Sequence, residues 1–279
     1  MKISMPDFVK PRWLLAAAAG LAILALLPGL FREPPQTEDL TGPGRDYLAQ
    51  LEQKDPDEVM GVLRARRREE LRLRRGELLK QVKAGELSPF QMLQEDAVIM
   101  GDSRAEGYWY YGFVDQSRTL TGPGHTILDL KKQLDTLEAM NPQYIYLLYG
   151  LNDVKIGFWG NSGRFVEAYM EYVDMIRQRL PESIVVISSI LPYQKAEEPT
   201  EPTTEPNLEV ERMKNIAKWN QALKAACQEH GVIFVDNAQI SQKYADRWEP
   251  DGIHVQRGFY QYWARNLVIA ALEEGSSEN

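Results

Sequence analysis

The sequence has little of two residue types that often carry chemistry. Its 279 residues include one cysteine, Cys227, and three histidines, His125, His230 and His254. A single cysteine excludes an intrachain disulfide and argues against a cysteine-based metal site. It does not define the compartment, because proteins without disulfides also work outside the cell. A mechanism that needs a histidine base must use one of these three side chains.

An excess of basic residues is also missing. The formal net charge is −8 and the pI is about 5.1. Nucleic-acid-binding domains usually have a basic face, so we expect no nucleic acid among the partners. The length is sufficient for one domain with a substantial core, plus extensions.

One segment near the N-terminus has no charge at all. Residues 13–31, WLLAAAAGLAILALLPGLF, approach the roughly 20 residues that cross a bilayer as a helix. Lys2, Lys10 and Arg12 precede the segment, which favours a cytoplasmic N-terminus in residues 1–12 and a body outside the membrane. A cleaved signal peptide is the competing interpretation, but the apolar run is long for one and no small-x-small cleavage site follows it. We therefore expect an uncleaved signal anchor.

Residues 32–95 are expected to join this anchor to the body. They begin with a polar Pro/Gly-rich linker and continue from Asp55 to about Ala84 as a charged helical stretch that contains RARRR. We interpret that stretch as a solvated spacer helix, with a partner-binding helix as the alternative. The GELSPFQMLQEDA segment breaks this helix and leads into the body, residues 96–275, before a short tail at 276–279.

From Asp96 onward the chain alternates between short apolar runs and amphipathic segments. This alternation predicts a parallel sheet of five strands with helices on both faces, an α/β fold of three layers. In such sheets the turns that follow the strands gather at one edge, where ligands bind. The expected strands are 97–100, 117–121, 144–149, 184–191 and 232–235, and the expected helices are 127–140, 165–180, 210–230 and 259–273.

One stretch of the body has no regular pattern. Residues 193–209, YQKAEEPTEPTTEPNLE, are rich in Pro, Thr and Glu and are expected to lack regular structure. They leave the fourth strand at the ligand-binding edge. They are either a plain insertion or an acidic lid.

Polar motifs follow the expected strands at that same edge. GDS (101–103) follows the first strand, TGPGHT (121–126) the second and YGLND (149–153) the third, while DGIH (251–254) precedes the last helix. With these motifs in this order, the chain resembles the SGNH/GDSL hydrolase superfamily over about residues 96–274. That resemblance implies a flavodoxin-like sheet and an esterase that needs neither a metal nor an organic cofactor.

The motifs contain the groups that an ester hydrolase needs. A serine hydroxyl is a weak nucleophile until a base removes its proton, so Ser103 requires a histidine. His254 is the best candidate, with Asp251 three residues earlier to orient its ring. His230 ends a helix and is interpreted as structural, while His125 is a minor candidate for the base.

The oxyanion hole is implied by the resemblance. Family members use the backbone N–H of the nucleophile, a glycine N–H in the second motif and an asparagine side chain in the third. By position these are Ser103, Gly124 and Asn152, with Gly122 as the alternative glycine.

Substrate contacts are less well defined by the sequence. Arg104 stands where the family motif has leucine, and we expect it to contact substrate together with His125, Trp109 and Asp153. The aromatic residues near the site would line a sugar or acyl groove or pack in the core. They are Tyr108, Trp109, Tyr110, Tyr111, Phe158 and Trp159.

These observations predict a membrane-anchored, extracytoplasmic serine esterase. Its substrate is expected to be an acylated carbohydrate or a small ester, with an O-acetyl group on a cell-wall or surface polysaccharide as the first choice. An acyltransferase that passes the acyl group to a sugar hydroxyl would use the same residues. A catalytically inactive binding module of the same fold is the alternative from another class.

Overall fold

The computed structural model describes residues 44–45, 56–194 and 207–277. They belong to two units, one extending to Ala65 and one beginning at Arg66. The first unit includes residues 44–45 and the N-terminal part of helix α3 (Pro56–Ala84). The second includes the rest of α3 and every element described below.

The second unit is built around five parallel strands in the order β2-β1-β3-β4-β5. This confirms the predicted parallel sheet. Strands β1 and β3 are buried along their whole length, as their continuous apolar sequences indicated. The strands are β1 (Ala97–Gly101), β2 (Thr119–Thr121), β3 (Tyr144–Leu148), β4 (Ile184–Ser188) and β5 (Ile233–Val235).

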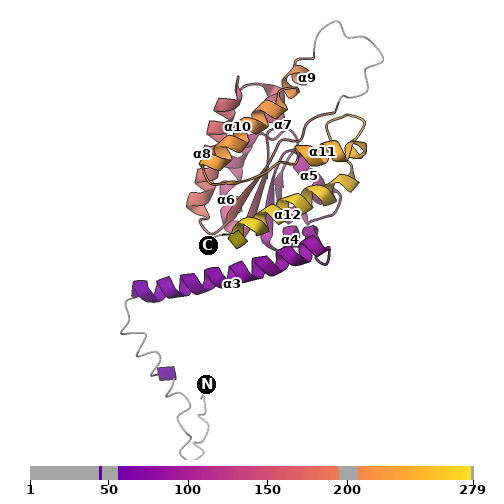
Figure 1. The fold of residues 1–279 in the computed structure, drawn as a ribbon. Coiled ribbons are helices and arrows are strands. Elements are labelled where there is room, and N and C mark those ends of the chain that lie inside the picture. Colours follow the sequence, from indigo (N-terminus) through magenta and orange to yellow (C-terminus); the bar gives the residue numbers. More distant parts are fainter. Residues whose placement is uncertain (1–43, 46–55, 195–206, 278–279) are drawn as a thin grey trace, which may run out of the picture. The chain divides into compact units, whose positions relative to one another are not determined.

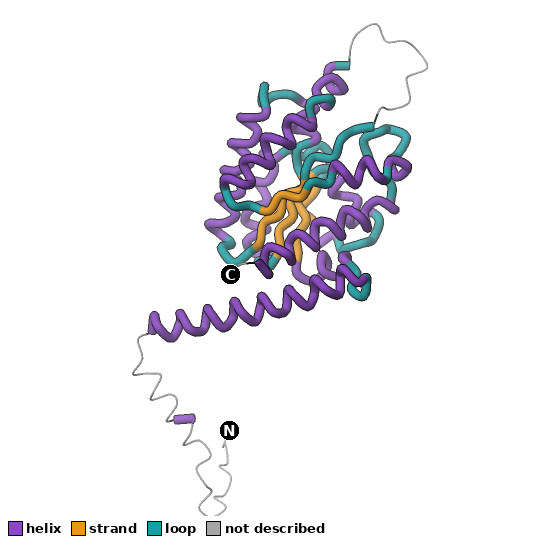
Figure 2. Tube along the Cα trace, viewed as in Figure 1, coloured by secondary structure: helices purple, strands orange, loops and turns teal. Residues whose placement is uncertain are grey.

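Helices cover both faces of the sheet, so the unit has three layers (Figures 1 and 2). Helices α4 and α12 pack on one face, and α6, α8 and α10 on the other. The α-helices after α3 are α4 (Pro89–Asp96), α5 (Ser103–Tyr110), α6 (Leu130–Met140), α7 (Leu151–Ile156), α8 (Ser162–Arg179), α9 (Leu208–Met213), α10 (Ile216–Glu229), α11 (Ala238–Lys243) and α12 (Tyr260–Ser277). Short 3₁₀ turns occur at Gln116–Arg118, Ile127–Asp129, Ala245–Arg247 and Arg257–Phe259.

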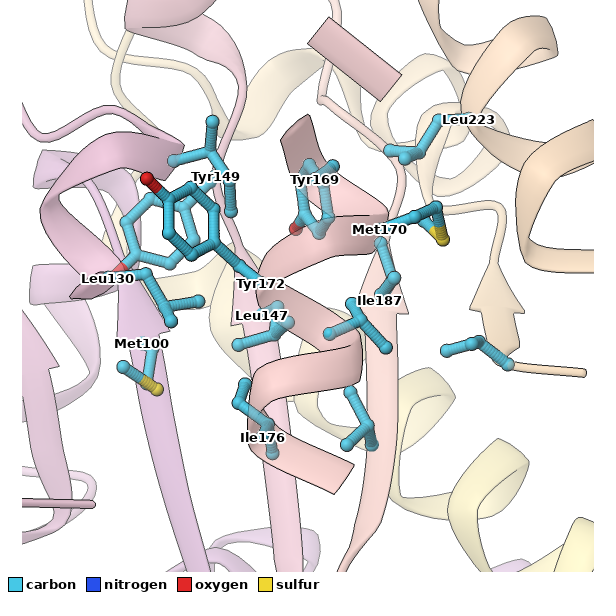
Figure 3. Close-up of a cluster of buried hydrophobic side chains, with 14 of the residues drawn as sticks. Met100, Leu130, Leu147, Tyr149, Tyr169, Met170, Tyr172, Ile176, Ile187 and Leu223 are labelled. Carbon is cyan, nitrogen blue, oxygen red and sulfur yellow. The ribbon is translucent and has the colours of Figure 1, made fainter. Parts of the chain in front are cut away.

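Alternate residues along each strand enter different core clusters, because successive side chains of a strand point to opposite faces. Val98 and Met100 belong to the cluster under α6, α8 and α10, whereas Ala97 and Ile99 belong to the cluster under α4 and α12. Figure 3 shows part of the first cluster, where Met100, Leu147 and Ile187 of three strands face side chains of α8. The two clusters hold the carboxyl edge of the sheet in place.

The register brings the strand ends level at that edge. Gly101 pairs with Thr121 on one side and with Leu148 on the other. The chain segments that follow β1, β2 and β3 therefore begin side by side. These are the segments that contain the GDS, TGPGHT and YGLND motifs.

Several local elements differ from the prediction. The spacer helix ends at Ala84, as predicted, but the segment that breaks it also forms α4, with a capping box between Ser88 and Gln91. The single helix expected at 210–230 is two, α9 and α10, because the chain makes tight turns at Lys214 and Asn215 between them. Helices α7 and α11 were not predicted.

The last turns of α3 are not solvated as a spacer helix would be. Val82 is buried, and Leu78 and Leu79 pack against the core cluster under α4 and α12. Arg265 of α12 donates to the Lys83 carbonyl, and Lys83 pairs with Glu273 of α12. From Arg66 on, α3 therefore belongs to the compact unit, which begins earlier than the predicted start at Asp96.

Four predictions concern residues that lie wholly or mostly outside the described ones. They are the cytoplasmic N-terminus at 1–12, the signal anchor at 13–31, the Pro/Gly-rich linker at the start of 32–95 and most of the irregular stretch at 193–209. Among the residues that the structure does describe, no helix combines the length and apolarity needed to cross a bilayer.

Candidate active site

The nucleophile candidate lies at the first position of a helix. Ser103 follows β1 and begins α5, and the helix is capped by Asp102, whose Oδ1 accepts a hydrogen bond from the Arg104 N–H at 2.9 Å. Because Asp102 caps the helix, the Ser103 hydroxyl is free for other contacts. The first backbone N–H groups of a helix have no partner within it, so the Ser103 N–H faces outward as a donor.

A histidine contacts this hydroxyl from a segment far away in sequence. Ser103 Oγ lies 3.0 Å from His254 Nε2, and His254 Nδ1 lies 2.6 Å from Asp251 Oδ2. The three groups form one hydrogen-bonded chain across 151 residues of sequence. Since a carboxylate accepts hydrogen bonds only, Nδ1 carries the ring proton and Nε2 is the acceptor that faces Ser103.

Local backbone contacts hold the Asp251–His254 segment. Asp251 Oδ1 accepts hydrogen bonds from the N–H groups of Ile253 at 2.8 Å and His254 at 2.9 Å. Trp248 and Val255 form an antiparallel bridge that closes this turn. One carboxylate oxygen of Asp251 thus fixes the turn, and the other contacts the histidine ring.

These contacts also determine the charge of Asp251. Partial burial alone would raise the pKa of this carboxyl, but hydrogen bonds from the His254 ring and from the N–H groups of His254 and Ile253 outweigh it. The pKa of Asp251 is therefore lowered, and the group is a carboxylate at neutral pH. The side chains of Asp251 and His254 are 47% and 44% exposed, so a substrate in solution can reach them.

Two further donors lie in the segments that follow β2 and β3, at the same sheet edge as Ser103. Asn152, in the first turn of α7, donates one Nδ2 hydrogen to the His125 carbonyl at 2.9 Å, which leaves the second for another acceptor. Gly124 has a φ of +74° and is exposed, and its N–H has no hydrogen-bond partner within the described residues. The alternative, Gly122, instead donates its N–H to Gly101.

The His125 ring lies over Gly122. A Cβ on Gly122 would come within 2.3 Å of His125 Nε2, so only glycine fits beneath the ring. His125 Nδ1 is buried and has no hydrogen-bond partner within the described part of the chain. Since His254 contacts Ser103 Oγ, His125 is not the base in this geometry, and its contact with substrate stays a prediction.

Two of the expected substrate contacts are buried instead. Arg104 is 3% exposed, and its guanidinium donates to backbone carbonyls. Asp153 is 0% exposed and accepts hydrogen bonds from the Ile127 N–H and from Trp159 Nε1. With these donors and acceptors used inside the protein, neither side chain is placed to bind substrate.

The aromatic residues divide between core and surface. Tyr108 is fully buried, and Trp109 is half-buried against the core cluster under α4 and α12, which does not favour its predicted role in substrate binding. Tyr110 and Phe158 are exposed, at 71% and 47%. Tyr110 and Phe158 are therefore more accessible to solvent than Trp109.

Sequence reasoning missed the groups that support the site. Tyr260 donates to the Arg104 carbonyl at 2.8 Å, and the Trp248 ring lies under the Arg104 guanidinium. The one signal was Gly107 in α5, where a Cβ would overlap the Tyr260 hydroxyl at 1.8 Å. A glycine inside a helix costs stability, so it indicates a close approach of this kind.

Within the described residues no group of three or more His, Cys, Asp or Glu side chains could hold a metal ion.

Burial makes Asp153 a titrating group near neutral pH. Loss of solvent raises its pKa from 3.8 to about 7, despite hydrogen bonds from Trp159 and Ile127. The folded state then holds the proton more tightly than the unfolded chain, so stability is greatest below pH 4 and falls as pH rises from about 4 to about 7.

Asp153→Asn should remove this pH dependence. The amide oxygen can replace Oδ1, which already accepts from both donors. Between pH 4 and pH 7 the free energy of unfolding of the wild type should fall by on the order of 4 kcal/mol relative to that of the variant. This figure is the energy equivalent of a pKa shift of about three units. Urea unfolding of both proteins at pH 4.5 and 7.5 measures the difference. If the difference between the two proteins is the same at both pH values, the raised pKa is wrong.

A serine, histidine and aspartate in one hydrogen-bonded chain, with further N–H donors at the same sheet edge, are the groups of a serine hydrolase site. Residues 99–261 match the GDSL-like Lipase/Acylhydrolase family. The chain belongs to this family and is a serine esterase, as the resemblance implied. No curated protein sequence matches the chain.

The chain is similar to several solved structures. A putative acylhydrolase from Bacteroides fragilis is 18% identical, covers 64% of this chain and 86% of its own, and has a TM-score of 0.48. A GDSL-like lipase from Bacteroides thetaiotaomicron is also 18% identical, with 64% and 87% covered and a TM-score of 0.49. A carbohydrate esterase family 3 protein from Talaromyces cellulolyticus is 15% identical, with 66% and 99% covered and a TM-score of 0.48.

Proposed function

We propose that this serine esterase removes an acyl group, an O-acetyl group first of all, from a carbohydrate polymer outside the cytoplasmic membrane. Ser103 is the nucleophile, His254 the base and Asp251 the residue that orients the base. The observation that carries this proposal is the continuous chain of contacts from Ser103 Oγ through the His254 ring to Asp251, at 3.0 and 2.6 Å.

The first half of the reaction forms an acyl-enzyme. Ser103 Oγ attacks the ester carbonyl carbon while its proton passes to His254 Nε2. Asp251 stabilises the imidazolium without taking its proton. The negative charge that develops on the carbonyl oxygen is held by the N–H groups of Ser103 and Gly124 and by the second Nδ2 hydrogen of Asn152. The carbon–oxygen bond to the leaving sugar then breaks, and the sugar oxygen takes the proton from His254.

The second half releases the acyl group. His254, neutral again, removes a proton from water as the water oxygen attacks the acyl carbon. The same donors hold the second oxyanion, and collapse returns the proton to Ser103 Oγ. The products are a carboxylic acid and an unmodified Ser103.

A large, surface-presented substrate is supported by the exposure of the site. The side chains of Asp251 and His254 are nearly half exposed. Tyr110 and Phe158, which the chain places after the GDS and YGLND motifs, are exposed aromatic rings of the kind that pack on sugars. An acyl group on a polymer strand can reach such a site without the polymer entering the protein.

Acetate release from a polymer tests this function. The purified full chain should release acetate from O-acetylated polysaccharide, and Ser103→Ala should not. The acetate is measured enzymatically, with and without an added carbohydrate acceptor. Transfer of acetate to the acceptor in place of release would favour an acyltransferase, and equal release by both proteins would contradict the proposal.

The extracytoplasmic location is supported by the sequence alone. The uncharged segment 13–31 follows Lys2, Lys10 and Arg12, which favours a signal anchor with the body outside. A reporter enzyme that works only outside the cytoplasm should therefore be active when it is fused after Asn279. A reporter that works only inside the cytoplasm should be inactive at the same position. A cytoplasmic signal would refute this orientation.

A further inference from the structure

The guanidinium of Arg104 in α5 contacts two other segments of the chain, residues 191–192 and the turn at 248–253. Its Nε donates to the Ile253 carbonyl at 2.7 Å, its Nη1 to Leu191 at 2.6 Å and its Nη2 to Pro192 at 3.3 Å. Its plane lies over the Trp248 ring, 5.3 Å from the ring centroid. The side chain is 3% exposed, so solvent takes almost no part in these contacts.

Two of the segments that meet at this guanidinium border the catalytic residues: α5 and the turn that precedes His254. Arg104 follows Ser103 directly in α5. Ile253 precedes His254, and Trp248 closes the turn that contains Asp251 through its bridge to Val255. The guanidinium thus links the helix with the nucleophile to the turn with the base, across 149 residues of sequence.

Burying a charged arginine side chain at this position costs free energy. We therefore expect that the planar shape of its guanidinium has a function here. Burial disfavours the charged guanidinium and lowers the pKa of Arg104 to about 10, although Asp102 and other acidic groups favour the charge. At neutral pH the group is still a cation. Apolar side chains usually fill a buried position as well as ions do. Only arginine offers a rigid, planar set of donors that reaches three carbonyls at once.

We propose that Arg104 is a positioning residue for the esterase reaction: its guanidinium fixes the Ile253–His254 peptide and thereby the distance between Ser103 Oγ and His254 Nε2. The inference rests on the proposed roles of Ser103 and His254. Arg104 does not touch the substrate. Its removal should therefore lower kcat and leave the KM for a small ester unchanged.

The expected fall in kcat follows from the need to keep His254 aligned with Ser103. Displacement of a catalytic group by about 1 Å can cost on the order of 100-fold in rate. Arg104→Ala leaves three carbonyls without their donor, so the turn can shift. We expect kcat for p-nitrophenyl acetate to fall about 10- to 100-fold.

Chemical rescue separates positioning from general damage. Arg104→Ala leaves a space of guanidinium shape between Trp248 and the three carbonyls. Guanidinium ion at millimolar concentration should occupy the space and restore kcat several-fold. Urea, which is planar and of similar size but neutral, should restore much less at the same concentration.

Arg257 provides the matched control. It also stacks on an aromatic ring, with its guanidinium 5.4 Å from the Phe113 centroid, but it is exposed. Arg257→Ala should keep wild-type kcat and should not respond to guanidinium.

The outcomes are distinct. The proposal is overturned if folded Arg104→Ala, checked by circular dichroism and its melting temperature, keeps kcat within twofold of wild type. It is also overturned if kcat falls but guanidinium restores none of it. Should Arg104→Ala fail to fold, Arg104→Lys takes its place: a lower kcat at unchanged KM supports positioning, and unchanged kcat refutes it. Failure of the proposed function itself would appear differently, as equal activity of wild type and Ser103→Ala.

Discussion

Replacing Ser103 by alanine should abolish ester hydrolysis while leaving the fold intact. The hydroxyl lies 3.0 Å from His254 Nε2, and without it no acyl-enzyme can form. Loss of a nucleophilic serine costs about a millionfold in kcat in enzymes with this kind of triad. The measurement is kcat for p-nitrophenyl acetate, corrected for the spontaneous reaction.

Stability should hardly change, because Asp102 rather than Ser103 caps α5. Surface substitutions away from such caps change the free energy of unfolding by less than about 0.5 kcal/mol. Ser162 is a matched control: it too is the first residue of a helix, α8, behind a capping residue, Asn161. Ser162→Ala should keep full activity. A loss of less than tenfold in Ser103→Ala would rule out Ser103 as the nucleophile.

The second large effect is expected at Asp251. An asparagine there can keep its oxygen on the N–H groups of Ile253 and His254, so the turn should be preserved. Its NH₂ group would then face His254 Nδ1, which now has to accept a hydrogen bond. The ring proton moves to Nε2, and the histidine can no longer take the proton of Ser103. An equivalent change in a serine protease lowers kcat about 10⁴-fold.

Esterase assays and urea unfolding of Asp251→Asn together test this explanation. The turn should stay folded, so the unfolding midpoint should move little while kcat collapses. Asp236 is a suitable control, since it is exposed and its carboxylate accepts a hydrogen bond from a backbone N–H, that of Ala238. Asp236→Asn should behave as wild type. Wild-type kcat in Asp251→Asn would show that Asp251 does not orient the base.

The central strands of the sheet could be predicted from the sequence because a strand that is buried on both faces consists almost entirely of apolar residues. Residues 144–148 and 97–101 are apolar along their whole length, and both are fully buried strands. Short helices were harder to predict. Helix α7 has six residues and its N-cap is Gly150, with a φ of +127°, so it carries neither a long amphipathic pattern nor a capping side chain. For α4 the signal was present, since Ser88, Pro89 and Gln91 are a typical helix start.

The site was predictable to a different degree at each residue. Ser103, Asp251 and His254 stand in short motifs, and the structure brings them together. Arg104 and Asp153 were misinterpreted because a charged residue next to a motif resembles a ligand-binding group. Their burial depends on partners that no local pattern reveals: the carbonyls that Arg104 contacts lie 87 to 149 residues away.

The distance along the chain between nucleophile and base also has a consequence for biosynthesis. Ser103 belongs to the first strand–helix connection of the sheet, whereas His254 comes after the last strand and just before α12. A growing polypeptide that has emerged as far as β5 has the hydroxyl but lacks the imidazole. Tyr260, which contacts the Arg104 carbonyl, emerges later still. Ester cleavage is therefore possible only when synthesis of this unit is almost complete, and shortened products that end before His254 should be inactive.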